Sequence, residues 1–186
     1  ISNLKSALKK NNHSQGFINS ASPGVISNFL PNKFYKNDDD YLEALSKMMK
    51  TEYDEITKND LLLQIDCPDL ALARHMTFKN VSDEEFLVRA EKQIECLNEA
   101  IKDIDASKLR MHICWGNYEG PHIHDIGLEK ILPIALKANI QTYLIEASNP
   151  RHAHEWKVFE NIKLPNDKII VPVSYTHLRA HETVED

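Results

Sequence analysis

The chain has 186 residues, a length typical of one domain of ordinary size or of part of a larger one. Hydrophobic residues make up 42% and charged residues 27%, which allows a buried core and excludes a chain that is disordered by composition. The 28 acidic residues outnumber the 22 basic ones, the net charge is -6 and no Lys/Arg cluster is present, so we expect no nucleic acid and no anionic membrane as a partner.

Short apolar runs alternate with amphipathic stretches along the chain. The apolar runs predict five strands, at 16–20, 61–66, 109–115, 142–147 and 168–172. The helical spacing of apolar residues predicts helices at about 38–58, from Ser82 to about 101, at about 125–138 and near 151–160. Ser82 is followed by Glu85 three residues on, which is the pattern of a capping box.

Strands that alternate with helices predict βαβ units and parallel pairing, because parallel strands need long crossover connections. Five such strands fit either a doubly wound α/β sheet or a large piece of a (β/α)8 barrel. The sequence contains no internal repeat, low-complexity tract or linker, so we expect a single domain.

Both ends of the chain are unusual for a natural protein. The chain begins without Met in a polar segment of helical character, and we expect an upstream part to be missing. Residues 173–186 resemble the conceptual translation of a transposase adapter from sequencing libraries, and we leave them out of the fold prediction. The alternative is a natural polar tail that contains histidine. We therefore expect an incomplete domain over 1–172 and a non-native tail over 173–186.

The sequence indicates a cytoplasmic location. A typical apolar run, 131–136, is far shorter than the ~20 residues that a membrane-spanning helix needs. The first residues show no signal-peptide pattern. The three cysteines are irregularly spaced and cannot form a disulfide framework, which favours a reducing compartment.

Chemically active side chains occur where predicted strands end, which is where parallel α/β folds place their sites. His112 and Cys114 lie two residues apart on one strand, so their side chains share a face. Imidazole and thiolate together suit zinc. The alternative is a buried pair that binds nothing, which is commoner for an isolated His-x-Cys.

Two carboxylates repeat this placement on the neighbouring strands. Glu146 ends an apolar strand, where an ionised carboxylate needs a partner. That partner is either a neighbour such as Arg151 or a metal ion shared with the adjacent strand. Asp66 likewise ends the strand at 61–66. Three consecutive strands that each end in a ligand or an anion favour a common site.

Four separated motifs resemble a known family. They are GlnIleAspCysProAsp at 64–69, HisIleCysTrpGlyAsn at 112–117, GlyProHis at 120–122 and GluAlaSerAsnProArgHis at 146–152. In this order they resemble cobalamin-independent methionine synthase, and most closely the short single-barrel relatives of its C-terminal catalytic domain. The resemblance implies a (β/α)8 TIM barrel with catalytic zinc at its C-terminal rim, represented here by an incomplete internal fragment of about five strands.

The resemblance also implies a zinc-binding set. His112, Cys114 and Glu146 match three zinc ligands of the family. The fourth ligand is a cysteine that the family has beyond the position of residue 172, and neither Cys67 nor Cys96 can replace it. We therefore expect the chain as written to bind zinc weakly and to be inactive.

The activity implied by the resemblance is methyl transfer from 5-methyltetrahydrofolate, as its polyglutamate, to homocysteine, which gives methionine without a corrinoid carrier. Asp66 matches the aspartate that holds the amino group of homocysteine. Zinc would supply the charge that ionises the substrate thiol, whose pKa is otherwise about 8.5.

Further residues are candidates for substrate binding because of where they lie. Trp115 and Asn117 adjoin the predicted metal pair, and Ser20 and Ser22 end the first strand. By contrast, the His-x-His pairs at 122–124 and 152–154 fall in predicted loops or helix starts and are interpreted as exposed polar residues, with metal binding by either pair as the alternative.

Other functions stay open at this point. A related zinc alkyltransferase would use another thiol, such as coenzyme M, or another alkyl donor. A decarboxylase of the uroporphyrinogen type shares the barrel but needs no metal. The last alternative is an inactive barrel fragment that binds nothing.

Overall fold

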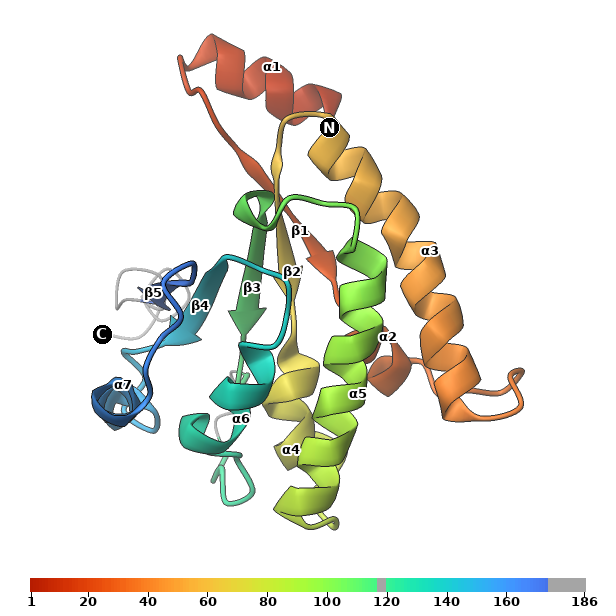
Figure 1. Cartoon of the computed structure of the whole chain (residues 1–186), viewed down its shortest axis with the longest axis vertical. Coiled ribbons are helices and arrows are strands. Elements are labelled where there is room, and N and C mark those ends of the chain that lie inside the picture. The colour runs from red at the N-terminus through yellow and green to blue at the C-terminus, as the bar shows by residue number, and fades with distance from the viewer. Residues whose placement is uncertain (117–119, 174–186) are drawn as a thin grey trace.

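The structure, a computed structural model, describes residues 1–116 and 120–173. Over these residues the chain forms a five-stranded sheet with helices packed against it (Figure 1). The strands are β1 (Phe17–Ala21), β2 (Leu62–Asp66), β3 (Leu109–Ile113), β4 (Thr142–Glu146) and β5 (Ile169–Val173). The α-helices are α1 (Ser2–Lys10), α2 (Pro23–Phe29), α3 (Asp38–Lys58), α4 (Leu72–Met76), α5 (Asp83–Ile101), α6 (Leu128–Ala135) and α7 (Val158–Asn161). Short 3-10 helices are η1 (Pro68–Leu70), η2 (Ala106–Lys108) and η3 (Ala153–Lys157).

All five strands are parallel and are hydrogen-bonded in chain order, β1-β2-β3-β4-β5. The predicted succession of βαβ units is thus confirmed. The register places Asp66 beside His112 and Ile113 beside Ile145. The carboxyl ends of β2, β3 and β4 therefore meet at one edge of the sheet, which we call the carboxyl edge and which points downward in Figure 1.

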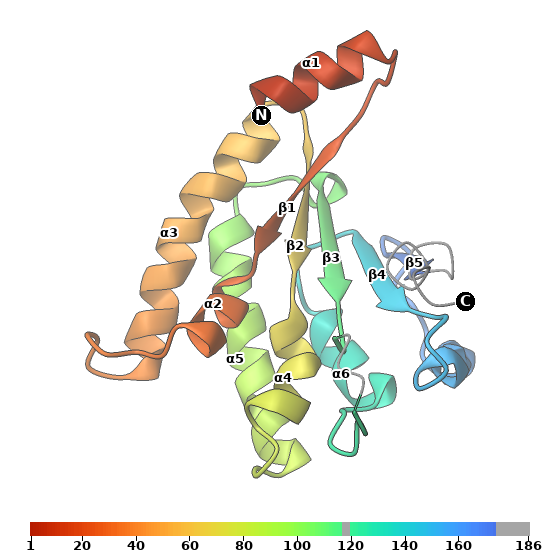
Figure 2. The ribbon, with the colours of Figure 1, turned by 180° about the vertical axis from the view of Figure 1, so that it is seen from behind.

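One face of the sheet packs against α3, α5 and α6, and seen from behind β1, β2 and β3 lie between α3 on the left and β4 on the right (Figure 2). Alternate strand residues on this face have an exposed fraction of 0%, namely Leu63, Ile65, Leu109, Met111 and Tyr143. Burying one such side chain stabilises the fold by roughly 1.5–3 kcal/mol. This apolar layer holds the strands, and with them the carboxyl edge, in register.

The opposite face of the sheet carries the alternate side chains, which are more polar. Gln64 and Asp66 on β2 lie beside Arg110 and His112 on β3 in the strand register. The Arg110 guanidinium lies 4.4 Å above the ring of Phe17 from β1. The prediction that the strand at 109–115 has two different faces is therefore confirmed, because Met111 and Ile113, which alternate with Arg110 and His112, are buried.

Both long helices begin at a capping residue. The Asn37 side chain accepts a hydrogen bond from the backbone N–H of Asp40, and three aspartates follow in the first turn of α3, where the helix dipole favours negative charge. The predicted capping box is present at α5, with Ser82 and Glu85 each bonded to the backbone of the other. These caps fix where the crossovers begin.

Some local structure differs from the prediction. Helix α2 was not predicted; it begins at Pro23, because Ser22 caps it and Pro23 occupies its first position. The five-residue helix α4 was not predicted. Strand β3 ends at Ile113, so Cys114 and Trp115 follow the strand instead of belonging to it.

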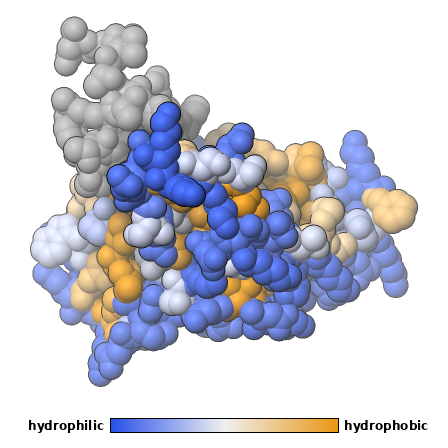
Figure 3. Space-filling model, turned by 90° about the horizontal axis from the view of Figure 1, so that it is seen from above, coloured by the Kyte–Doolittle hydropathy of each residue, from blue (hydrophilic) through white to orange (hydrophobic). Residues whose placement is uncertain are grey.

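The surface mixes polar and apolar side chains. Phe17 and Ile169, near the starts of their strands, are 44% and 48% exposed. Viewed from above, onto the end away from the carboxyl edge, apolar patches lie between hydrophilic residues (Figure 3). Within the described residues, no helix combines the length and the apolar character that crossing a membrane requires.

Candidate functional site

The predicted site residues Asp66 and His112 meet at the carboxyl edge. Asp66 is the last residue of β2, and the parallel register sets it directly beside His112 of β3. Asp66 Oδ1 lies 3.2 Å from His112 Nδ1, and both side chains are about one-third exposed. The same oxygen accepts a hydrogen bond of 3.3 Å from Gln64 Nε2. This contact follows from strand pairing and not from the loops.

Cys114 lies just beyond β3 on the same side as His112, and its thiol is half-buried. Its Sγ accepts a hydrogen bond of 3.2 Å from the backbone N–H of Gly116. Burial raises the pKa of the Cys114 thiol, and the Gly116 hydrogen bond opposes this. The negative charges of Asp66 and Glu146 raise the pKa further. Anionic groups from β2 and β4 are therefore close enough to Cys114 to act on its charge.

Gly116 makes the turn after Cys114 possible. Its φ of +82° lies in the left-handed region, where a residue with a Cβ is strained. A Cβ at this position would also lie only 2.7 Å from the Leu72 side chain. The glycine thus lets the chain turn closely behind the Cys114 sulfur.

Glu146 ends β4, and its carboxylate turns back to its own loop. Its Oε1 accepts hydrogen bonds from the backbone N–H groups of Ser148 at 2.7 Å and Asn149 at 2.8 Å. His112, Cys114 and Glu146 share the carboxyl edge, but they are not among the described groups whose three ligand atoms all lie within 4.8 Å. The structure brings the predicted ligands to one edge without closing them into a coordination shell.

The predicted substrate-binding serines make contacts within the protein. Ser20 is buried and donates a hydrogen bond to Glu52 of α3. Ser22 is buried, caps α2 through the Val25 N–H, and donates a hydrogen bond of 2.6 Å to Asp69. A role of either serine in substrate binding stays a prediction.

Trp115 lies on the other side of β3 from Cys114. Its exposed fraction is 3%, and its Nε1 donates a hydrogen bond of 2.8 Å to the Ile126 carbonyl. Its ring lies 4.6 Å, centre to centre, from the ring of His152. Asn117, the remaining predicted substrate contact, lies outside the described residues.

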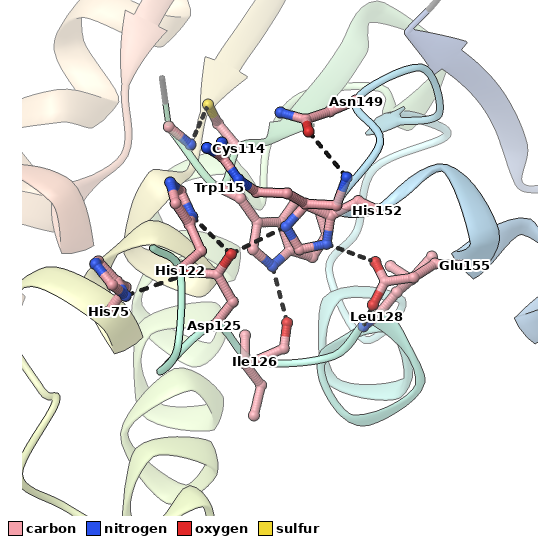
Figure 4. A network of polar contacts seen from close by, with 12 residues as sticks. His75, Cys114, Trp115, His122, Asp125, Ile126, Leu128, Asn149, His152 and Glu155 are labelled. Carbon is pink, nitrogen blue, oxygen red and sulfur yellow. Dashed lines mark hydrogen bonds and ion pairs between the residues drawn. The ribbon is translucent and has the colours of Figure 1, made fainter. Parts of the chain in front are cut away.

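A second group of ligand-type side chains lies beside Trp115 (Figure 4). Asp125 Oδ2 is 2.7 Å from His122 Nδ1 and 3.0 Å from His152 Nε2. His122 and Asp125 come from the loop after β3, whereas His152 follows β4. The ligand atoms of these three residues all lie within 4.8 Å of one another, so the group could hold a metal ion.

The charges of this cluster shift its ionisation. Burial acts to raise the pKa of Asp125, but hydrogen bonds from His152 and His122 hold it below its ordinary value. Burial acts to lower the pKa of His152, whereas its hydrogen bonds to Asp125 and Glu155 raise it to about 9. Without a metal, an imidazolium at His152 is thus held between two carboxylates.

The interpretation of these histidines as exposed holds only for His154, because the His122 and His152 side chains are buried and His124 is half-buried. Only 4% of the His122 side chain and 6% of the His152 side chain is exposed. His154 is exposed, as predicted. Each His-x-His pair contributes one member to the cluster, and Asp125 joins them. The spacing of Asp125, three residues after His122, was the one available sequence signal.

A cavity of about 290 Å³ opens onto the cluster. Its walls include the three ligand-type residues together with Arg151 and Glu155. The group is therefore buried in the protein on most sides and reachable from one.

Comparison with known proteins does not identify a family or a function for this site. No protein-family model, no curated protein and no solved structure matches the chain.

Proposed function

We propose that this chain carries the zinc-dependent methyl-transfer site of a protein of the cobalamin-independent methionine synthase kind, which methylates homocysteine with 5-methyltetrahydrofolate to give methionine. The observation that carries the proposal is the gathering of four side chains at the carboxyl edge of three neighbouring parallel strands, namely Asp66, His112, Cys114 and Glu146. Their types and order also match the motifs of that family.

The sheet supports a (β/α)8 barrel as the complete fold. A doubly wound sheet reverses its strand order at a switch point. The described strands run in unbroken chain order, as the strands of a barrel do. Helices packed on one face of the sheet also agree with a barrel, in which helices form the outer ring.

The donor set fits zinc in its chemistry. Imidazole nitrogen, thiolate sulfur and carboxylate oxygen are the ligand atoms that zinc takes in proteins. The pairing of His112 Nδ1 with the Asp66 carboxylate is the contact that commonly orients a metal-binding imidazole, and it assigns Nε2 to the ion. When bound here, zinc would supply the positive charge that lowers the pKa of a substrate thiol.

Asp66 is suited to hold the substrate ammonium group. Its two described hydrogen-bond contacts both use Oδ1, so Oδ2 can accept from an ammonium. Holding the amino acid end at Asp66 would direct the thiol towards Cys114 and His112, and such fixed orientation lowers the entropic part of the barrier.

Cobalt(II) substitution and thiol titration test the proposal. Cobalt bound through Cys114 gives a sulfur-to-cobalt charge-transfer band, which we expect in the parent chain and not in Cys114→Ser. Homocysteine should strengthen the band by adding a second sulfur. Asp66→Asn should weaken homocysteine binding roughly 10- to 100-fold, the equivalent of one charged hydrogen bond.

Matched controls separate this site from general damage. Cys96→Ser changes a cysteine buried between α3 and α5 and should leave the band intact. Asp66→Asn should not weaken binding of coenzyme M, a thiol without an ammonium group. A band that survives Cys114→Ser would contradict the proposal. Tighter binding of coenzyme M than of homocysteine would instead favour the related alkyltransferase.

A further inference from the structure

We propose that His122, Asp125 and His152 form a second metal site, which binds a divalent first-row transition metal such as zinc and joins the loop after β3 to the loop after β4. This inference does not rest on the methyl-transfer function, because the cluster shares no residue with the carboxyl-edge set. Two imidazoles and one carboxylate with an open position are a recurring ligand set for such ions.

The ligand atoms already converge on one point. His122 Nδ1 and His152 Nε2 both face Asp125 Oδ2, at 2.7 Å and 3.0 Å. Figure 4 shows the two rings pointing towards the carboxylate from different loops. Small side-chain rotations would let an ion take the central position, because three ligand atoms within 4.8 Å are close to the spacing that coordination needs.

Glu155 supplies the outer contact that metal-binding histidines usually have. Its Oε2 lies 3.1 Å from His152 Nδ1, which fixes the ring and leaves Nε2 directed at Asp125. The other oxygen, Oε1, accepts a hydrogen bond of 2.9 Å from the first backbone N–H of α6, at Leu128. The orientation of His152 is therefore tied to a helix and not to a free loop.

One oxygen of Asp125 lacks a hydrogen bond within the part of the chain that the structure describes. Its Oδ1 is buried and accepts no hydrogen bond from the described residues. His75 Nδ1 lies 3.8 Å from it, beyond hydrogen-bond distance. A buried carboxylate oxygen without a hydrogen bond is costly, and a bound cation would offset that cost.

The cluster has both support and access. Trp115 packs its ring 4.6 Å from the His152 ring and is anchored through the Ile126 carbonyl. The cavity of about 290 Å³ reaches the cluster from outside and leaves room for water or a small ligand on the ion. Trp115, which packs on His152, belongs to the apolar core, whereas Cys114 does not, so the cluster is distinct from the predicted zinc ligands.

The test is metal titration of the Cys114→Ser chain with zinc and with cobalt(II). To remove binding by histidines beyond the described residues, His177 and His181 are changed to Ala in the same background. We expect one metal ion per chain, and cobalt absorption without a sulfur charge-transfer band. X-ray absorption of the zinc form should show only nitrogen and oxygen neighbours, at about 2.0–2.2 Å.

Variants assign the site to its residues. His122→Ala and Asp125→Asn should each weaken metal binding more than ~100-fold, and Glu155→Gln about 10- to 100-fold, since it only orients His152. His154→Ala removes an exposed histidine two residues from His152 and should change nothing. Circular dichroism of each variant checks that it is folded.

Three results would overturn the proposal. The first is that the folded Cys114→Ser chain binds no metal. The second is that X-ray absorption shows a sulfur ligand, from another cysteine, on the zinc of that chain. The third is that neither His122→Ala nor Asp125→Asn weakens metal binding. Absence of the sulfur-to-cobalt band from the parent chain would count against the methyl-transfer proposal and leave this site standing, so failure of that proposal is separately visible.

Discussion

At the scale of single residues, Asp69 is the most unusual carboxylate beneath the carboxyl edge. It is 3% exposed, and burial raises its pKa to about 6 although the Ser22 hydroxyl donates to it and lowers the pKa again. The ionised form is therefore less favourable in the folded chain than in the unfolded one, where an aspartate has a pKa of about 3.9.

This shift predicts a stability that falls as pH rises. The folded pKa lies above the unfolded one, so the contribution of Asp69 is fully present below about pH 4 and is lost as pH rises through about 6. A difference of about two pKa units corresponds to roughly 3 kcal/mol. We expect Asp69→Asn, which keeps an acceptor for Ser22, to abolish this loss.

Urea unfolding of both chains between pH 4 and pH 7.5 measures the effect. Glu160→Gln serves as a control, because it removes a carboxylate that is exposed to solvent. If the stability difference between the parent and Asp69→Asn were the same at both ends of this range, Asp69 would not titrate as the structure implies.

At the scale of elements, helix α2 is held in place by an N-cap and by close packing, and not by an amphipathic repeat in its sequence. Its seven residues, Pro23–Phe29, form about two turns, too few to show an amphipathic repeat. The helix is fixed instead by the Ser22 cap and by the close approach of Gly24 to Asp69. A Cβ built on Gly24 would lie 2.1 Å from Asp69 Oδ2 and 2.8 Å from its Cγ. Only glycine lets α2 pack this closely.

We therefore expect Gly24→Ala to lower the free energy of unfolding by about 1–3 kcal/mol, the usual cost of overpacking. Gly127→Ala is the matched control, because its Cβ would meet its nearest neighbours at an ordinary 3.7 Å. That change meets no steric obstacle, and its cost should not exceed the roughly 1 kcal/mol of replacing glycine by alanine at the N-cap of α6. In an Asp69→Ala background the Gly24→Ala penalty should shrink, and an undiminished penalty would show that Asp69 is not the obstacle.

At the scale of the whole molecule, periodic segments were predictable and loop-built features were not. The long helices α3 and α5 and all five strands follow from apolar spacing and caps, and the contact between Asp66 and His112 follows from parallel register. The cluster at Asp125 joins residues from two loops, and their meeting depends on Trp115 and on tertiary contacts. The spacing of residues along the chain does not show which loops meet in the folded protein. The sequence therefore predicted His122 and His152 to be exposed.

The same distinction predicts how stability is distributed over the chain. Strands β2 and β3 are each paired on both sides, and their helix-facing residues, such as Ile65 and Met111, are fully buried. Helix α1, by contrast, buries none of its residues completely. Amide groups open locally where few apolar contacts must be broken, so opening free energies should be lowest in α1 and highest in the central strands.

Native-state hydrogen exchange followed by mass spectrometry tests this order. We expect peptides from 2–10 to exchange with an opening free energy of about zero, and peptides that cover β2 and β3 to exchange only at the global unfolding free energy. Added zinc should slow exchange at 120–128 and 150–156 in the Cys114→Ser chain and leave α1 unchanged, because the ion would join those two loops. Protection of α1 equal to that of β3 would contradict the ranking, since α1 contributes only the partly buried Leu4 and Leu8 to the apolar core.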